Sequence, residues 1–339
     1  VFNMSGGTVE GGQSSGYGGN IGIYNNTTVN ITGGTVTGGV GKEGGNISIN
    51  GAGAKLNIDG PAVTSAGTAN GGGWAPGGNI FANGGATVNI GGGATITGGT
   101  ATGGNPQGHN LCMDGANTTI NLYDCTVHNT SNGNANIGFD AGTLNIDGAT
   151  VTNEGSAVVN ILTSNYAGCV AKVYIKSGTI SGGTDGNIGL YEDDFCVMTG
   201  GTVKNGISYN DQGGNIFCSG ALTITGGEFK AGRVSGSGGV AYVTGSNSVV
   251  RGGTYTAGGQ TNYAGFFRFD GSATITGINL SGGKATTNGN NIAFGSNGNA
   301  TVAVTIKGKA DIKMIFLNET NKIFNMGRAD TVIYIKSVG

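Results

Sequence analysis

Carboxylates are the side chains of this sequence with the clearest catalytic potential, and their densest group is Glu192, Asp193 and Asp194. The three residues are consecutive and follow the segment 187–190 directly. Two carboxyl groups held close together can act as acid and base on a glycosidic bond. Neighbours along an extended segment, however, point in opposite directions. We therefore interpret the group first as a solvated loop and only second as an acidic site.

A second pair of carboxylates, Asp114 and Asp140, is separated in sequence but equivalent in spacing. Each lies four residues after an asparagine that recurs along the chain, Asn110 and Asn136. If those asparagines mark equivalent positions of a repeat, the aspartates stack about one strand spacing apart, ~4.8 Å. Such a pair can bind a cation through its oxygen atoms. The alternative is that each aspartate only forms a turn, since a glycine follows closely after both.

Histidines and cysteines form no recognisable site. His109 and His128 are the two histidines, and neither belongs to a catalytic triad pattern. There are five cysteines and no CxxC pair, which argues against a zinc site. We therefore predict no catalytic residue, no metal centre and no cofactor. The candidate disulfides are a bond from Cys196 to Cys169 or Cys218, and a bond between Cys112 and Cys125.

A sequence repeat of about 26 residues, called the repeated phrase below, runs along the chain and must position these side chains. Its clearest copy, GGNIGIYNNTTVNITGGTVTGG at 18–39, contains N-I-x-I, a turn, V-N-I, and then G-G-T-V-T-G-G. Apolar and polar residues alternate over three short segments of each copy, which is the pattern of half-buried strands. Glycine clusters between the segments supply tight turns. No segment has the 3.6-residue period of a helix.

Three strands in a repeat of this length predict a parallel β-solenoid. Strands of one coil lie on different faces, so each must pair with the equivalent strand one coil away, in parallel and in register. Propeller blades need about 40–45 residues, and left-handed hexapeptide solenoids have shorter coils. We therefore expect a right-handed parallel β-helix of about 12 coils, the hand that is usual for parallel crossovers.

The first asparagine of the phrase recurs at nearly constant spacing. A buried amide needs hydrogen-bond partners, because leaving one unmade costs about 1–3 kcal/mol. We predict that these asparagines form one inward-turned ladder at a corner of the coil, and that Val240 and Phe266 take the equivalent position after them. The predicted ladder is Asn20, Asn46, Asn79, Asn110, Asn136, Asn160, Asn187 and Asn215.

A second row of asparagines is expected on the outside. In V-N-I the two apolar residues face inward, so the asparagine between them faces outward. Such a row can pair with glycans or with another molecule, or its amides can simply stack on one another in solvent. The row is Asn30, Asn57, Asn89, Asn121 and Asn145, and tyrosine, valine and threonine take its place in later coils.

Composition excludes several kinds of partner. Only 10% of the residues are charged and the net charge is −2, so there is no basic footprint for nucleic acid or for anionic lipid. No apolar run approaches the ~20 residues of a membrane-spanning helix. With 37% hydrophobic residues the chain also differs from the weakly hydrophobic, strongly charged sequences that stay disordered. We predict neither a nucleic-acid partner nor a membrane span.

The repeated phrase G-G-N-I-x-I…V-N-I-x-G-G-T-V-T-G resembles the glycine-rich right-handed β-helix repeats of bacterial surface proteins. It is similar in style to the repeats of polymorphic outer-membrane proteins and of pectate-lyase-like solenoids. The resemblance extends to about residue 311. It implies a secreted or surface-attached protein with a structural or adhesive role, although some relatives are polysaccharide lyases or hydrolases.

We therefore expect a non-enzymatic extracellular scaffold of a bacterial surface, such as a stalk, an adhesin segment or a filament subunit. The alternative is a carbohydrate-active β-helix, as a polysaccharide lyase or hydrolase or as a glycan binder. Scarce histidine, arginine and clustered aspartate favour the scaffold. Ice binding is a further alternative, since Thr-x-Thr recurs at 35–37 and 95–97, but His128 and Lys204 interrupt the same row.

Two regions are predicted, a repeat array over 1–311 and C-terminal coils over 312–339. Glycine thins out in the second region and apolar residues gather there, which suggests a cap or a junction to a further module. Residues 1–7 align with 28–34 of the repeat, so we expect the first coil to be uncapped. An apolar last coil can dock on such a first coil of another molecule and build a filament. The expected partners are therefore the protein itself, end to end, and glycans.

Overall fold

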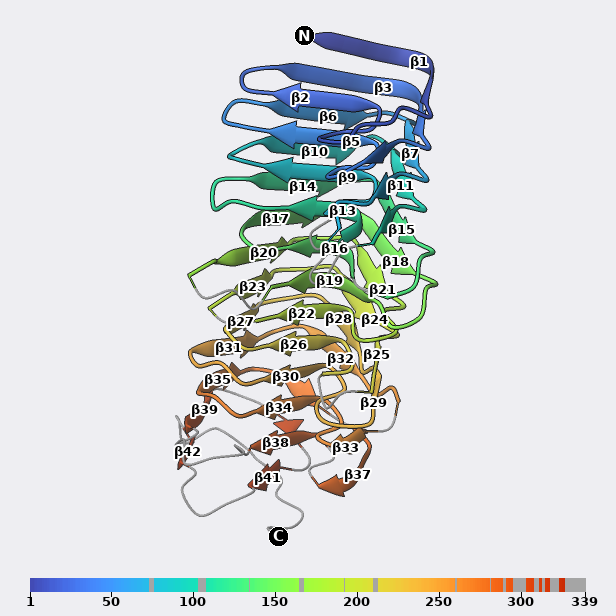
Figure 1. The fold of residues 1–339 in the computed structure, drawn as a ribbon. Helices are drawn as coiled ribbons and strands as arrows, with labels where there is room; N and C mark the ends of the chain where they lie inside the picture. The colour runs from blue at the N-terminus through green and yellow to red at the C-terminus, as the bar shows by residue number, and fades with distance from the viewer. Residues whose placement is uncertain are drawn as a thin grey trace. The chain divides into compact units, whose positions relative to one another are not determined.

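The computed structural model describes residues 1–72, 76–102, 108–133, 135–164, 168–191, 193–209, 213–259, 261–280, 282–288, 291–294, 303–307, 311–312, 315–317 and 323–326. Within them every regular element is a β-strand (Figure 1). The chain divides into two compact units, Val1–Ile180 and Ser181–Gly339. Both are parallel β-solenoids, so the predicted fold class is confirmed. The period is about 27 residues and there are about ten turns, so the expected dozen coils is approximate.

Unit 1 has three faces, each a stack of parallel strands. The first face is β2 (Ile21–Tyr24), β5 (Ile47–Asn50), β9 (Ile80–Asn83), β13 (Gly108–Met113), β16 (Ala135–Phe139) and β19 (Val159–Thr163). The second is β6 (Lys55–Asp59), β10 (Thr87–Gly91), β14 (Thr119–Tyr123), β17 (Gly142–Asp147) and β20 (Ala171–Ile175). The third is β7 (Val63–Ser65), β11 (Thr95–Thr97), β15 (Thr126–Asn129), β18 (Thr150–Asn153) and β21 (Thr179–Ser181). The long strands β1 (Phe2–Glu10) and β3 (Thr28–Thr37) pass over both of these faces, and β3 pairs with β6 and β7.

Unit 2 repeats this arrangement. Its first face is β22 (Ile188–Leu190), β26 (Ile216–Cys218), β30 (Ala241–Val243), β34 (Phe267–Phe269), β38 (Ile292–Phe294) and β41 (Ile315–Leu317). The second is β23 (Phe195–Met198), β27 (Ala221–Ile224), β31 (Ser248–Arg251), β35 (Ala273–Thr276), β39 (Ala303–Lys307) and β42 (Ile323–Met326). The third is β24 (Thr202–Lys204), β28 (Glu228–Lys230) and β32 (Thr254–Thr256), followed by the pair β36 (Asn279–Leu280) and β40 (Asp311–Ile312).

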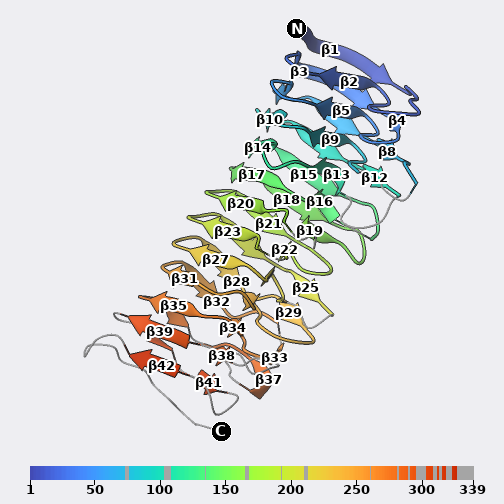
Figure 2. The same ribbon diagram turned by 60° about the vertical axis from the view of Figure 1, so that its left-hand side comes forward.

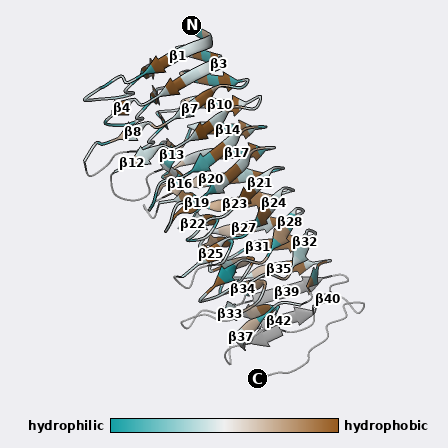
Figure 3. Ribbon diagram, turned by 90° about the vertical axis from the view of Figure 1, so that its right-hand side faces the viewer, coloured by the Kyte–Doolittle hydropathy of each residue, from teal (hydrophilic) through white to brown (hydrophobic). Residues whose placement is uncertain are grey.

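Pairing between turns is in register, which stacks equivalent apolar side chains into columns. Val88 of β10 pairs with Leu56 of β6 on one side and with Ile120 of β14 on the other. All three side chains have no exposed surface. Burial of such a side chain contributes roughly 1.5–3 kcal/mol, so repeated columns supply most of the cohesion. Figure 3 shows the corresponding hydrophobic segments along the strands.

The interior of unit 2 is more aromatic than the repeated phrase predicts. Phe229 and Tyr255 stack with their ring centroids 5.2 Å apart. Tyr255 also meets Phe267 edge-on at 5.2 Å, and Phe267 stacks on Phe269 at 5.7 Å. Offset-stacked and edge-to-face pairs of this kind add about 0.5–1.5 kcal/mol each beyond area burial. Aromatic packing therefore replaces part of the valine and isoleucine packing of unit 1.

Short strands also lie in the loops that precede the first face, which makes a fourth set of stacks. In unit 1 these are β4 (Val40–Gly41), β8 (Thr68–Ala69) and β12 (Thr100–Ala101), visible in Figure 2. In unit 2 they form two pairs, β25 (Ile207–Ser208) with β29 (Arg233–Val234), and β33 (Thr261–Tyr263) with β37 (Ala285–Asn288). We call these connections the excursion loops, because each leaves the coil after the third face and returns to it before the first.

The predicted boundary at residue 311 is untested, because most of the residues from 312 onward lie outside the described part of the chain. The same holds for the predicted apolar contact of the last coil with another molecule. In the described residues no helix is long and apolar enough to cross a membrane.

Candidate functional site

The predicted inward ladder of asparagines is present in both units. In unit 1 the Nδ2 group of each ladder residue donates to Oδ1 of the next, at 2.7–2.8 Å from Asn20 to Asn136 and at 3.5 Å from Asn136 to Asn160. In unit 2 Asn187 donates to Asn215 at 2.8 Å. From Asn46 onward the ladder side chains have no exposed surface. The ladder is therefore a buried chain of amides that joins successive turns.

Six of the eight ladder asparagines also hold the ends of their own coils together, and Asn79 illustrates how. Its Nδ2 group donates to the carbonyl of Thr97 at 2.8 Å, in addition to Asn110. Its Oδ1 accepts from Asn46 at 2.8 Å and from the backbone N–H of Gly67 at 3.0 Å. Two donors and two acceptor positions are all that an asparagine side chain possesses. The amide is therefore fully satisfied, which explains why it can be buried.

The ladder changes where the sequence loses asparagine. The backbone N–H of Ile216 donates to the carbonyl of Val240, and that of Val240 donates to Phe266. Val240 and Phe266 thus occupy the predicted equivalent positions. Asn291 resumes the pattern, since its Oδ1 accepts from Gly283 N–H at 3.1 Å.

The outward row of asparagines is a second ladder. Each amide donates to the asparagine of the preceding turn, and the row begins at Asn3, one turn before Asn30. The distances from Asn30 to Asn3, Asn57 to Asn30, Asn89 to Asn57, Asn121 to Asn89 and Asn145 to Asn121 are 2.7–2.8 Å. The amides of the row are therefore bonded to one another and not merely stacked. Because each uses one N–H and one oxygen lone pair in the row, the remaining donor and acceptor can meet solvent or a partner.

Asp114 and Asp140 lie in adjacent turns as predicted, because Met113 pairs with Phe139 immediately before them. Oδ1 of Asp114 accepts from the N–H of Gly115 at 2.6 Å, and its carbonyl accepts from the Thr118 hydroxyl at 2.6 Å. Asp114 is therefore engaged in its own turn. Burial raises the pKa of Asp140 to about 6; the Ser164 hydroxyl opposes the rise and the neighbouring Asp114 carboxylate adds to it. The described residues hold no group of three or more side chains of the metal-binding types.

Of the predicted acidic cluster, Glu192 lies outside the described residues. Asp193 is exposed, whereas Asp194 is only 1% exposed. The two residues lie in a turn, in which the Asp194 N–H donates to the Tyr191 carbonyl at 3.1 Å, and not in the extended segment that the sequence suggested.

Both histidines have structural partners. Nδ1 of the buried His109 accepts from the N–H of Ala101 at 3.1 Å, and Nε2 donates to the Asn132 and Gly133 carbonyls at 3.1 and 2.5 Å. Burial lowers the pKa of His109, and the two carbonyl contacts oppose that shift. His109 thus ties its excursion loop to the next turn. His128 lies 2.9 Å from the Thr152 hydroxyl through Nδ1.

None of the five cysteines forms a disulfide, so the proposed pairings are wrong. Cys196 and Cys218 are both fully buried core residues. Burial raises the pKa of the Cys125 and Cys218 thiols to about 12. Burial likewise raises the pKa of Cys112 and of Cys196. These thiols therefore act as apolar core side chains.

The excursion loops close at narrow necks that require glycine. A Cβ added to Gly12 would lie 2.1 Å from the carbonyl oxygen of Gly19, and one added to Gly206 would lie 2.0 Å from that of Gly214. No side chain fits at such a separation. The N–H of each first glycine donates to a ladder asparagine, Asn20 at 2.8 Å and Asn215 at 3.0 Å. At these two necks the inner ladder thus fixes the point from which the loop projects, whereas at the neck before Val240 the Gly232 N–H donates to the Gly239 carbonyl instead.

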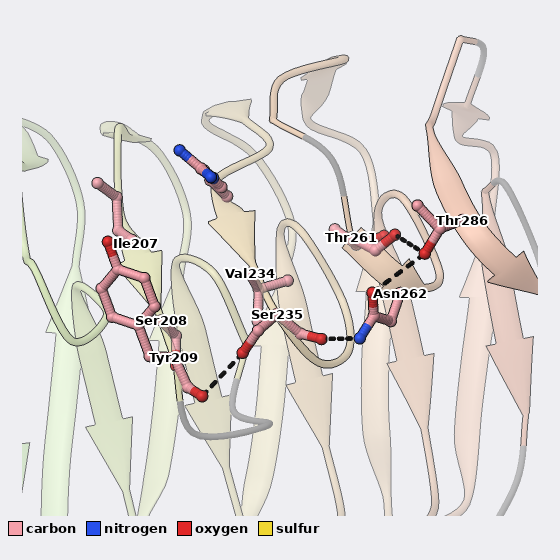
Figure 4. Close-up of a pocket in the computed structure, with 9 residues that line it drawn as sticks. Ile207, Ser208, Tyr209, Val234, Ser235, Thr261, Asn262 and Thr286 are labelled. Carbon is pink, nitrogen blue, oxygen red and sulfur yellow. Dashed lines mark hydrogen bonds between the residues drawn. The ribbon is translucent and has the colours of Figure 1, made fainter.

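In unit 2 the excursion loops enclose a groove of about 280 Å³. Four successive turns contribute to it, through residues 207–209, 233–235, 261–262 and Thr286 (Figure 4). Polar contacts connect the turns: the Ser235 hydroxyl donates to the Tyr209 carbonyl at 2.8 Å, and the Asn262 amide donates to the Ser235 carbonyl. The Thr286 hydroxyl donates to Oδ1 of Asn262 at 3.0 Å. This groove is an open hollow at the surface of unit 2 that polar and aromatic side chains line.

The sequence did not predict the groove, because its residues belong to loops that lack the repeated phrase. A search of family models, of curated proteins and of solved structures finds no match to this chain.

Proposed function

We propose that the protein is a non-enzymatic scaffold that acts outside the cell, as a stalk, adhesive segment or filament component of a bacterial surface. Its sequence repeats resemble those of such proteins. The proposal rests on the use that unit 1 makes of its polar side chains. Two asparagine rows, one inside and one outside, are bonded from turn to turn.

Hydrogen bonds that join successive turns suit a protein that must resist being pulled apart along its length. A hydrogen bond between side chains in a buried row contributes about 0.5–1.5 kcal/mol net, and an unmade one costs more. Separation of two turns must break both rows together with the backbone ladders of three faces. In a scaffold the polar side chains can bond to one another and hold the turns together. An enzyme must instead keep reactive side chains accessible to its substrate at one site.

The location can be tested with an antibody raised against the purified chain and applied to cells of the source organism. We expect labelling of intact cells, with an antibody to a cytosolic protein as the negative control. Labelling that appears only after permeabilisation would contradict an extracellular role.

The absence of catalysis can be tested on a panel of plant, bacterial and animal polysaccharides. We expect neither new reducing ends nor the ultraviolet absorbance of unsaturated lyase products. Turnover that an Asp193→Asn or an Asp140→Asn variant abolishes would overturn the proposal in favour of the carbohydrate-active alternative.

A further inference from the structure

The groove of unit 2 combines an exposed aromatic ring, an arginine and a set of polar side chains. Tyr209 is 66% exposed, although it lies on an excursion loop whose neighbour Ser208 is fully buried. Exposure of a large aromatic ring beside a hollow provides a flat apolar surface with a polar tip. Such a surface suits a ligand with one apolar face and a polar rim.

Arg233 lines the same groove and brings a positive charge to it. Its side chain is exposed, and it makes no hydrogen bond or ion pair with any residue that the structure describes. A Cβ added to Gly259 would lie 2.7 Å from the Cβ of Arg233, so glycine at 259 leaves room for the arginine stem. The planar guanidinium matches the geometry of a carboxylate, to which it can donate two parallel hydrogen bonds.

The groove also offers donors and acceptors in alternation. Ser235 Oγ donates to Tyr209 and retains its lone pairs as acceptors. Asn262 uses one N–H on Ser235 and retains the second. The Ser235 oxygen can accept a hydrogen bond and the Asn262 amide can donate one. A hydroxyl group of a ligand, which both donates and accepts, suits such a pair.

We propose that this groove binds an acidic sugar. The carboxylate lies on the Arg233 guanidinium, one face of the sugar ring packs on Tyr209, and ring hydroxyls bond to Ser235 and Asn262. The volume of about 280 Å³ suits one sugar residue of a longer chain. This binding activity goes beyond the scaffold role and does not depend on it, because the residues that carry it lie outside the asparagine rows.

Titration calorimetry and NMR with glucuronate and its neutral methyl ester test the proposal. We expect saturable binding of glucuronate and at least tenfold weaker binding of the ester. Arg233→Gln should weaken glucuronate binding about tenfold or more, and Tyr209→Ala should also weaken it. Arg251→Gln removes an exposed arginine of strand β31 that does not line the groove, and should leave the affinity unchanged. Circular dichroism of each variant verifies that it is folded.

Four results would overturn the proposal. The first is equal affinity for the acid and its ester, since the carboxylate would then contribute nothing. The second is an Arg233→Gln variant that is folded and binds as the parent does. The third is inorganic phosphate that binds as tightly as glucuronate at equal ionic strength, which would make the groove a general anion site and not a sugar site. Absence of any saturable glucuronate binding would equally reject it.

Discussion

The side-chain amide of Asn79 donates a hydrogen bond of 2.7 Å to Oδ1 of Asn110, one turn further along the solenoid. Through its other contacts Asn79 also anchors the end of the third strand at Thr97 and the neck of the excursion loop at Gly67. Where asparagine occupies this position, it thus stacks the turns, closes the coil and sets the base of the loop. Among the loops that line the groove, the loop of Tyr209 has such a base, because the Gly206 N–H donates to Asn215.

Substitution Asn79→Ala should lower the free energy of unfolding of unit 1 by about 2–4 kcal/mol. It removes the partners of Asn46 N–H, Gly67 N–H and the Thr97 carbonyl, all of which stay buried or half-buried. Urea unfolding followed by circular dichroism measures the loss.

The matched control for that variant is Asn89→Ala in the outer row of the same unit. Asn89 also bonds to asparagines of the adjacent turns, but it is half-buried, so water replaces the lost partners. We expect a cost below about 1 kcal/mol. Equal costs for the two variants would refute the distinct role of the inner ladder.

Substitution Asp140→Asn should stabilise unit 1 above pH 6 and have little effect in acid. The pKa of Asp140 is about 6 in the folded state, mainly because of burial, against about 3.9 in an unfolded chain. The folded state therefore binds more protons between these values, and its stability falls as the pH rises through that window. Removing the charge should raise the free energy of unfolding by about 1–2 kcal/mol near pH 8. Thermal melts of parent and variant at several pH values measure this difference, with Asp59→Asn as a surface control. A gain in stability that is the same at every pH would contradict the explanation.

His109 should take up its second proton at a lower pH than an ordinary histidine, and in its neutral form the proton lies on Nε2. Nδ1 accepts from the Ala101 N–H, and burial lowers the pKa of the ring. The unfolded chain, with a histidine pKa of about 6.5, then takes up a proton first, so stability is lost as the pH falls below that value. Nitrogen-15 NMR of the imidazole distinguishes the tautomer directly; a ring that is protonated at neutral pH or carries its proton on Nδ1 would contradict the assignment.

Cys169 should react with thiol reagents before the other four cysteines. It is half-buried, whereas Cys112, Cys125, Cys196 and Cys218 are buried. The thiolate is the reactive form, and burial raises the pKa of each of the four. Ellman's reagent on the folded protein should therefore give one fast equivalent, which Cys169→Ser removes. Five equivalents at one rate under native conditions would show that the core cysteines are not shielded.

The fold could be predicted from the sequence because the residues of each repeat determine how its strands pair with those of the adjacent turns. The phrase V-N-I places two apolar residues inward and one asparagine outward, and Asn57 pairs with Asn30 and Asn89 as that alternation requires. The inner ladder was equally predictable, since a recurring buried amide needs hydrogen-bond partners, and its copies in adjacent turns and the turn backbone supply them.

The excursion loops and the groove could not be predicted in this way. Glycine pairs such as those at Gly12 and Gly19 look like ordinary turn residues in the sequence, although they face each other across a neck. Tyr209, Arg233 and Asn262 belong to three turns and share no repeated pattern, so only the stacking of the loops brings them together. The aromatic pair of Phe229 and Tyr255 could not be predicted either. The two residues replace aliphatic ones, so the alternation of apolar and polar residues along their strands is unchanged.

The central claim, that the solenoid is a scaffold held turn to turn chiefly by its inner asparagine row, is tested most directly by pulling one molecule from its two ends. With about 27 residues in a turn, each released turn should lengthen the chain by about 9 nm, at ~3.3–3.6 Å per residue. We predict force peaks separated by that length, one of which Asn79→Ala lowers while Asn89→Ala leaves it nearly unchanged. A smooth extension at low force without steps of that length, or peaks that neither variant alters, would contradict the account.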